Sequence, residues 1–153
     1  MSIIFTRRFL KLTVIWVSIF AFVSACNIKP EPIQYGYDEC SYCKMTIVDK
    51  AHSAQLVTKK GKQYKYDAIE CLVWNINEVP ELALNSILLV ADYQSPGDLL
   101  PAEEAAYIIS TGIKSPMGAN LSAVENVQRV DSLLQHFKGN KYNWEQLLEV
   151  LSE

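Results

Sequence analysis

The hydrophobic and polar positions in the first half of the chain predict two strands, a helix and a third strand. The strands are expected at residues 53–59, 63–67 and 85–93. The first two are separated by Lys60-Gly61, a turn-forming pair, and therefore predict a hairpin. Apolar residues recur at helical spacing over residues 68–79, where Asp67 is placed to cap the helix and Pro80 to stop it.

The second half predicts the same order of elements. Strands are expected at residues 105–110, 120–124 and 140–144. Val124 to Gly139 is an amphipathic helix that glycine ends, a short helix follows at residues 145–151, and residues 94–104 form a loop rich in Pro, Gly and acid. The pattern therefore predicts an α+β fold with two small ββαβ modules, at about residues 45–93 and 105–143, in one compact domain.

The N-terminal sequence predicts that the protein is exported from the cytoplasm. Three basic residues precede Leu12 to Val23, an uncharged apolar run of 12 residues. This run is too short to span a bilayer of roughly 30 Å and is typical of a signal-peptide core. It leads into Val23-Ser24-Ala25-Cys26, which resembles a bacterial lipobox.

This interpretation divides the chain into three parts. Residues 1–25 are a lipoprotein signal peptide, residues 26–37 are the lipidated Cys26 with a proline-containing tether, and residues 38–153 are the domain. Acyl chains on Cys26 would hold the domain on a bacterial membrane, on its periplasmic or cell-surface face. A simple N-terminal membrane anchor with a chance cysteine is the alternative.

Charge and motifs exclude several function classes. The chain has 14 basic and 17 acidic residues, and loss of residues 1–25 removes three basic ones, leaving 11 against 17, a net charge of −6. The sequence has no basic patch, so nucleic acid is not an expected partner. It has two histidines, no recognisable nucleophile motif, no GxGxxG and no P-loop, so we expect no enzyme activity.

The stretch DECSYCKM, residues 38–45, carries the candidate chemistry. If Cys26 is lipidated, three cysteines remain, and an odd number outside the cytoplasm leaves one thiol free or bound to something. Cys40, Cys43 and Met45 offer thiolate and thioether sulfurs, which are soft donors that suit Cu(I). Zinc binds thiolates readily, but a thioether is not one of its usual ligands.

Other interpretations of these residues stay open. Met45 would also serve as the first core residue of the hairpin, and the CxxC as a redox pair, a disulfide or half of a zinc site. Met117 lies between turn formers in SPMG, which is unusual for a core residue. His52 either reaches the site or lies on the surface. Cys71 is expected as a buried core thiol.

Four motifs together resemble the NosL family, lipoproteins associated with nitrous oxide reductase maturation and thought to carry copper. The family pattern C-x-x-C-G-M with a downstream aspartate is similar to residues 40–45 with Asp49. An aromatic-Asp step matches residues 66–67, and G-P-M-G matches residues 115–118. Lys44 and Ser115 replace two glycines of the family motifs.

The resemblance implies a fold of two ββαβ modules and Cu(I) binding through Cys43 and Met45. Cys40, Met117 or His52 would complete the site, and the client would be a copper-requiring protein such as nitrous oxide reductase. We therefore expect a membrane-anchored Cu(I) chaperone outside the cytoplasm. The rival interpretations are a thiol-disulfide module and a structural or zinc-binding lipoprotein.

Overall fold

The computed structural model describes residues 28–152. The predicted signal peptide and Cys26 lie outside the described residues. The elements in chain order are β1 (Ala54–Val57), β2 (Gln63–Tyr66), α2 (Ile69–Glu78), the 3-10 turn η1 (Pro80–Leu82), β3 (Ile87–Ala91), β4 (Leu99–Pro101), β5 (Ala106–Ile109), β6 (Leu121–Val124), α3 (Val127–Leu134), β7 (Asn140–Tyr142) and α4 (Trp144–Val150).

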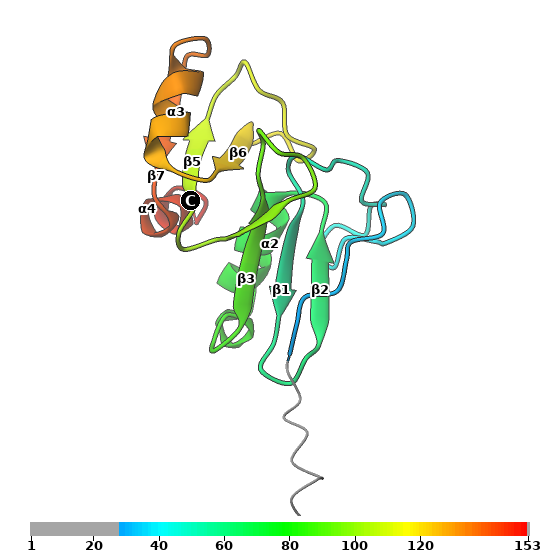
Figure 1. Ribbon diagram of the computed structural model, residues 1–153. Coiled ribbons are helices and arrows are strands. Elements are labelled where there is room, and N and C mark those ends of the chain that lie inside the picture. The colour runs from blue at the N-terminus through cyan, green and yellow to red at the C-terminus, as the bar shows by residue number, and fades with distance from the viewer. Residues whose placement is uncertain (1–27, 153) are drawn as a thin grey trace, which may run out of the picture.

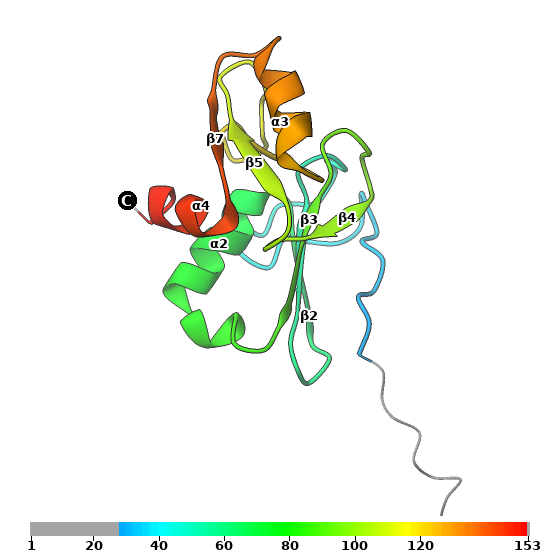
Figure 2. The ribbon, with the colours of Figure 1, turned by 60° about the vertical axis from the view of Figure 1, so that its left-hand side comes forward.

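The first module is an antiparallel sheet in the order β2-β1-β3-β4, with α2 packed on one face (Figures 1 and 2). Strand β1 is buried throughout because it lies in the middle of this sheet. The predicted loop at residues 94–104 is wrong in part, because it contains β4. That strand has three residues, and it forms by pairing Leu100 with Val90, a tertiary contact that local turn signals conceal.

Helix α2 begins one residue later than its predicted cap allows. The N-cap is Ala68, and no side chain caps the helix, so the prediction for Asp67 is wrong. The Asp67 carboxylate is instead buried, and its Oδ1 has no hydrogen-bond partner among the described residues. Burial raises the pKa of this carboxyl, and the nearby Val48 backbone N–H opposes that shift.

The second module is an antiparallel sheet in the order β6-β5-β7, with α3 packed against it. Helix α3 is shorter than predicted because Asn126 caps it, accepting from the Arg129 backbone N–H at 3.1 Å. Trp144 and Leu147 of α4 reach back into the core cluster that contains α2. The α+β fold of two ββαβ modules is confirmed, with β4 as an added strand and the larger core shared between the modules.

The segment before the site packs on the first sheet. The side chains of Gln55, Gln63 and Lys65 donate to backbone carbonyls of residues 29–32, at 2.8, 3.1 and 2.9 Å. These three residues lie on one face of the β1–β2 pair, because Gln55 is directly opposite Lys65 and Gln63 is two residues along. The segment therefore crosses the sheet face opposite α2.

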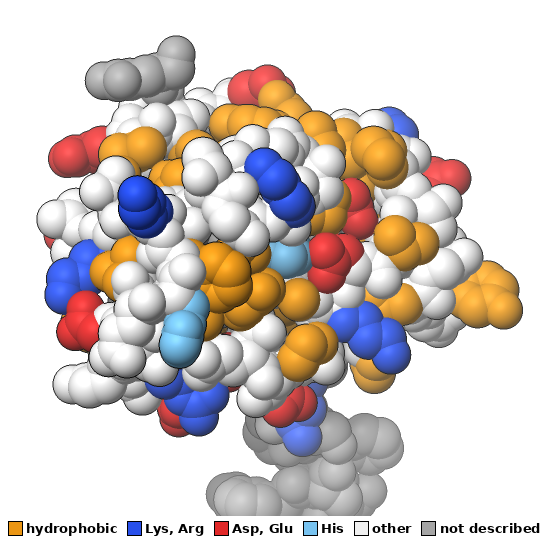
Figure 3. Space-filling model, turned by 90° about the horizontal axis from the view of Figure 1, so that it is seen from above, with side chains coloured by type: hydrophobic (Ala, Val, Ile, Leu, Met, Phe, Trp, Pro, Cys, Tyr) orange, Lys and Arg blue, Asp and Glu red, His pale blue; other side chains and the backbone are white. Residues whose placement is uncertain are grey.

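Charges are dispersed on the face of the molecule that Figure 3 shows. Figure 3 shows one face, where basic, acidic and apolar side chains are interspersed and no single sign dominates. Within residues 28–152, no helix is both long and apolar enough to cross a membrane.

Candidate metal centre

The CxxC lies in a short hairpin-like loop ahead of β1. Glu39 and Thr46 form an isolated antiparallel bridge, and the Cys40 N–H donates to the Met45 carbonyl at 2.8 Å. The Lys44 N–H closes the turn on the Cys40 carbonyl at 3.1 Å. Lys44 has φ 66°, a left-handed conformation that favours glycine, which is the residue in the family motif at this position.

Two neighbouring elements hold this loop in place. On β2, the Lys65 ammonium pairs with Asp38 at 2.7 Å, and the Ser41 N–H donates to the Lys65 carbonyl at 2.7 Å. On α2, Glu78 accepts from the Tyr42 hydroxyl at 2.7 Å. The Lys65 contact and the Gln34 N–H outweigh partial burial and hold the pKa of Asp38 below its usual value. The loop therefore has a fixed position against α2.

Three free thiols meet where the loop contacts α2. The sulfurs of Cys40, Cys43 and Cys71 all lie within 4.8 Å of one another. Cys40 and Cys71 are buried, whereas Cys43 is half-buried. Cys71 is a buried core residue, as the sequence predicts, but it also completes this cluster, which the sequence analysis missed. The odd number of cysteines was the signal in the sequence that could have indicated Cys71 as a member of the site.

The three thiols differ in the direction of their pKa shifts. The Cys71 thiol donates to Cys40, and the backbone N–H groups of Asp67, Cys43 and Tyr42 also point at that sulfur, which lowers the pKa of Cys40 well below its usual value. The same thiol contact raises the pKa of Cys71. Burial raises the pKa of Cys43. The thiol contact and the three backbone N–H groups therefore favour the thiolate form at Cys40.

The two candidate methionines differ in burial. Met45 is 53% exposed, and its position directly across the small hairpin from Cys40 puts both side chains on one face of that hairpin. Met117 is partly buried and packs against the core cluster that contains Cys40 and Cys71. It is placed there by Ser115, whose buried hydroxyl donates to Glu70 of α2.

His52 is not on the surface. It is 3% exposed, its Nδ1 lies 2.8 Å from Asp49 Oδ2, and its Nε2 lies 3.1 Å from Ser122 Oγ. Because both ring nitrogens have partners, binding of copper by His52 would require one of these contacts to break. The contact with Ser122 on β6 instead joins the two modules.

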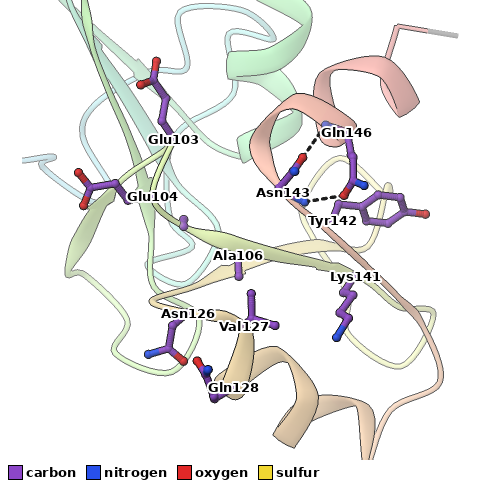
Figure 4. A pocket seen from close by; sticks show the side chains of 11 residues that line it. Glu103, Glu104, Ala106, Asn126, Val127, Gln128, Lys141, Tyr142, Asn143 and Gln146 are labelled. Atoms are coloured by element: carbon purple, nitrogen blue, oxygen red, sulfur yellow. Dashed lines mark hydrogen bonds between the residues drawn. The ribbon is translucent and has the colours of Figure 1, made fainter.

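A pocket of about 480 Å³ lies at the second module, and no cysteine lines it (Figure 4). Its lining includes Glu103, Glu104 and Asn126, with no cysteine, methionine or histidine. Asn143 and Gln146 hydrogen-bond each other across the start of α4. The pocket therefore has none of the soft donors that copper prefers.

Comparison with known proteins places the chain among copper-binding relatives. The family model described as NosL matches residues 34–151. The copper-binding lipoprotein NosL of Stutzerimonas stutzeri is 29% identical over 130 residues, which cover 79% of this chain and 68% of the relative. The crystal structure of the copper chaperone NosL from Shewanella denitrificans matches with a TM-score of 0.66 at 18% identity, covering 77% of this chain and 94% of that one.

Proposed function

The chain belongs to the NosL family, and on that premise we propose that it is a membrane-anchored Cu(I) chaperone that works outside the cytoplasm. The relatives are named as a copper-binding protein and a copper chaperone and not as enzymes, in agreement with the expectation that this chain is not an enzyme. The observation that carries the proposal is the cluster of three unbridged thiols. Thiolates are soft ligands that favour Cu(I).

The site we propose includes Cys43 and Met45, with Cys40 beside them and Met117 as a further candidate. Copper is cargo here, so the ligands must be displaceable. Half-buried Cys43 and exposed Met45 give an incoming partner access to the ion, whereas a closed cage of four ligands would not.

The geometry argues against the thiol-disulfide alternative. A redox cysteine needs a low pKa and exposure to its substrate. In this protein Cys40 is 1% exposed, so it is hidden from a protein substrate, and burial raises the pKa of the half-buried Cys43 thiol. Neither cysteine of the CxxC therefore meets both requirements.

A structural zinc site also fits less well. Such sites are closed by four ligands. The group of His, Cys, Asp and Glu ligand atoms found here, among the residues that the structure describes, has three members. Three soft donors suit Cu(I), which accepts low coordination numbers.

Anaerobic titration of the reduced protein with Cu(I), against a competing chelator, tests the proposal. We expect one tightly bound copper, with weaker binding in Cys43→Ser and in Met45→Leu. Val48→Ala removes a 66% exposed apolar side chain from the same segment and should leave copper binding unchanged. No competitive binding by the reduced wild-type protein would refute the proposed function.

The membrane anchor and the client belong to the same proposal. We propose that residues 1–25 are removed and that Cys26 is lipidated; the Stutzerimonas stutzeri relative is named a lipoprotein. Cys26→Ala should release the protein from the membrane fraction. The client we propose is a copper-requiring enzyme such as nitrous oxide reductase, and deletion of this protein should leave that enzyme deficient in copper.

A further inference from the structure

Cys71 occupies a position that the CxxC motif does not predict. It lies in the first turns of α2, on a different segment from Cys40 and Cys43, and its side chain is fully buried. The three sulfurs come together only when the loop is docked on α2. A buried thiol at this distance from two others is available as a ligand once it loses its proton.

The spacing of the sulfurs fits one ion. A metal–thiolate bond is about 2.3 Å long, as zinc sites show. An ion at the centre of a plane of three sulfurs would therefore hold them about 4 Å apart. The observed sulfurs already lie within 4.8 Å of one another, so a small closure of the cluster is enough.

We propose that Cys71 is a copper ligand, so that Cu(I) lies in a plane of three thiolates that α2 closes on the inner side and that opens outward only at Cys43 and Met45. This inference rests on the proposed function and deepens it. Cys40 and Cys71 supply the two buried thiolates, and Met45, whose side chain is 53% exposed, supplies a fourth sulfur outside that plane, which a partner displaces first.

Transfer in this arrangement is ligand exchange without a redox step. Copper stays Cu(I) throughout. Each copper–sulfur bond that breaks in this protein is replaced by a bond to a donor of the partner, and each thiolate that leaves the ion regains a proton from solvent. Exchange proceeds from the exposed side inward, with Cys71 released last.

The experiment compares two buried positions on α2 in the full chain, purified in detergent and reduced. Cys71→Ala removes the proposed ligand, and Val73→Ala, which is equally buried two residues along, is the matched control. Loss of groups outside a metal's own ligands already costs about 10–100-fold in affinity. We therefore expect Cys71→Ala to bind Cu(I) about a hundredfold more weakly or worse, and Val73→Ala to stay within about threefold of wild type.

X-ray absorption of the copper-loaded wild-type protein gives a second readout that does not depend on the variant folding. A shell of three sulfurs at the metal–thiolate distance of about 2.3 Å supports the proposal, because the chain from Cys40 onward has only Cys40, Cys43 and Cys71 to supply three thiolates. A shell with two sulfurs at that distance overturns it. A folded Cys71→Ala variant with wild-type affinity also overturns it, while tight binding by the wild type keeps the proposed function. Failure of the wild type to bind Cu(I) overturns both.

Discussion

Replacing Glu70 by glutamine should stabilise the folded protein at neutral pH and have no effect in acid. The Glu70 side chain is fully buried on α2, next to Cys71. Its Oε1 accepts from the Ser115 hydroxyl, and its Oε2 has no hydrogen-bond partner among the described residues. Burial, which outweighs the Ser115 contact, raises the pKa of this carboxyl above its usual 4.5.

The direction of the pH effect follows from this raised pKa. The folded state keeps the proton of Glu70 to a higher pH than the unfolded chain does, so stability falls as pH rises from 4.5 through the folded-state pKa. Glutamine keeps the acceptor for Ser115 and cannot ionise. Glutamine thus avoids the cost of ionising a buried carboxyl, which is about 1.4 kcal/mol for each unit by which burial raises the pKa. We therefore expect a gain of about 1 kcal/mol or more at about pH 8 and none at about pH 4.

Urea unfolding followed by the fluorescence of Trp74 and Trp144 measures the difference at both pH values. An exposed control, Glu81→Gln, should change stability little at either pH. A gain from Glu70→Gln of equal size at both pH values would refute the argument from ionisation. A loss at about pH 8 would show that the carboxylate has a favourable partner, such as a cation.

Three further predictions concern stability and the ligand set. His52→Gln should lower the free energy of unfolding by about 1–3 kcal/mol, measured in urea, because Asp49 and Ser122 lose their partner. A chelator titration should find the Cu(I) affinity of this variant unchanged. Weaker Cu(I) binding by the folded variant would make His52 a ligand. Lys44→Val should be about 1–2 kcal/mol less stable than Lys44→Gly, because the backbone there is left-handed; equal unfolding midpoints would contradict this. In Gly139→Ala the new Cβ would lie 2.9 Å from the Cβ of Ser110, and this close contact should lower the free energy of unfolding by about 1–3 kcal/mol. A variant as stable as the wild type would mean that the backbone beside Ser110 moves aside at no cost.

The order of elements was predictable because it depends on local periodicity. Alternation and helical spacing gave every strand except β4 and gave α2 and α4 closely. Strand β4 was missed because three residues after a Ser-Pro-Gly turn give no alternation, and only the pairing with β3 makes them a strand. Asp67 was assigned as a cap because it is a typical capping residue, but its carboxylate is buried in the folded chain and caps no helix.

The site was predictable only in its local part. Cys40, Cys43 and Met45 lie within six residues, so their proximity follows from the sequence. Cys71 lies near them only because the loop packs on α2. Its neighbours in the sequence are apolar at helical spacing, a pattern that does not distinguish a metal ligand from an ordinary buried cysteine. His52 has no apolar periodicity that marks it as buried, and its contact with Ser122 lies in the other module, 70 residues along the chain.

The two departures from the family motif differ in their physical consequences. Lys44 occupies a backbone conformation that suits glycine, so the lysine adds strain without a compensating buried contact; its ammonium bonds an exposed carbonyl of Ser41. Ser115 instead supplies a hydroxyl that gives Glu70 its partner and also accepts from the Asn120 N–H at 2.9 Å. A glycine at position 115 has no hydroxyl, so Glu70 would lose this hydrogen bond. In this chain the serine therefore fastens the loop that carries Met117 to α2, the helix that carries Cys71.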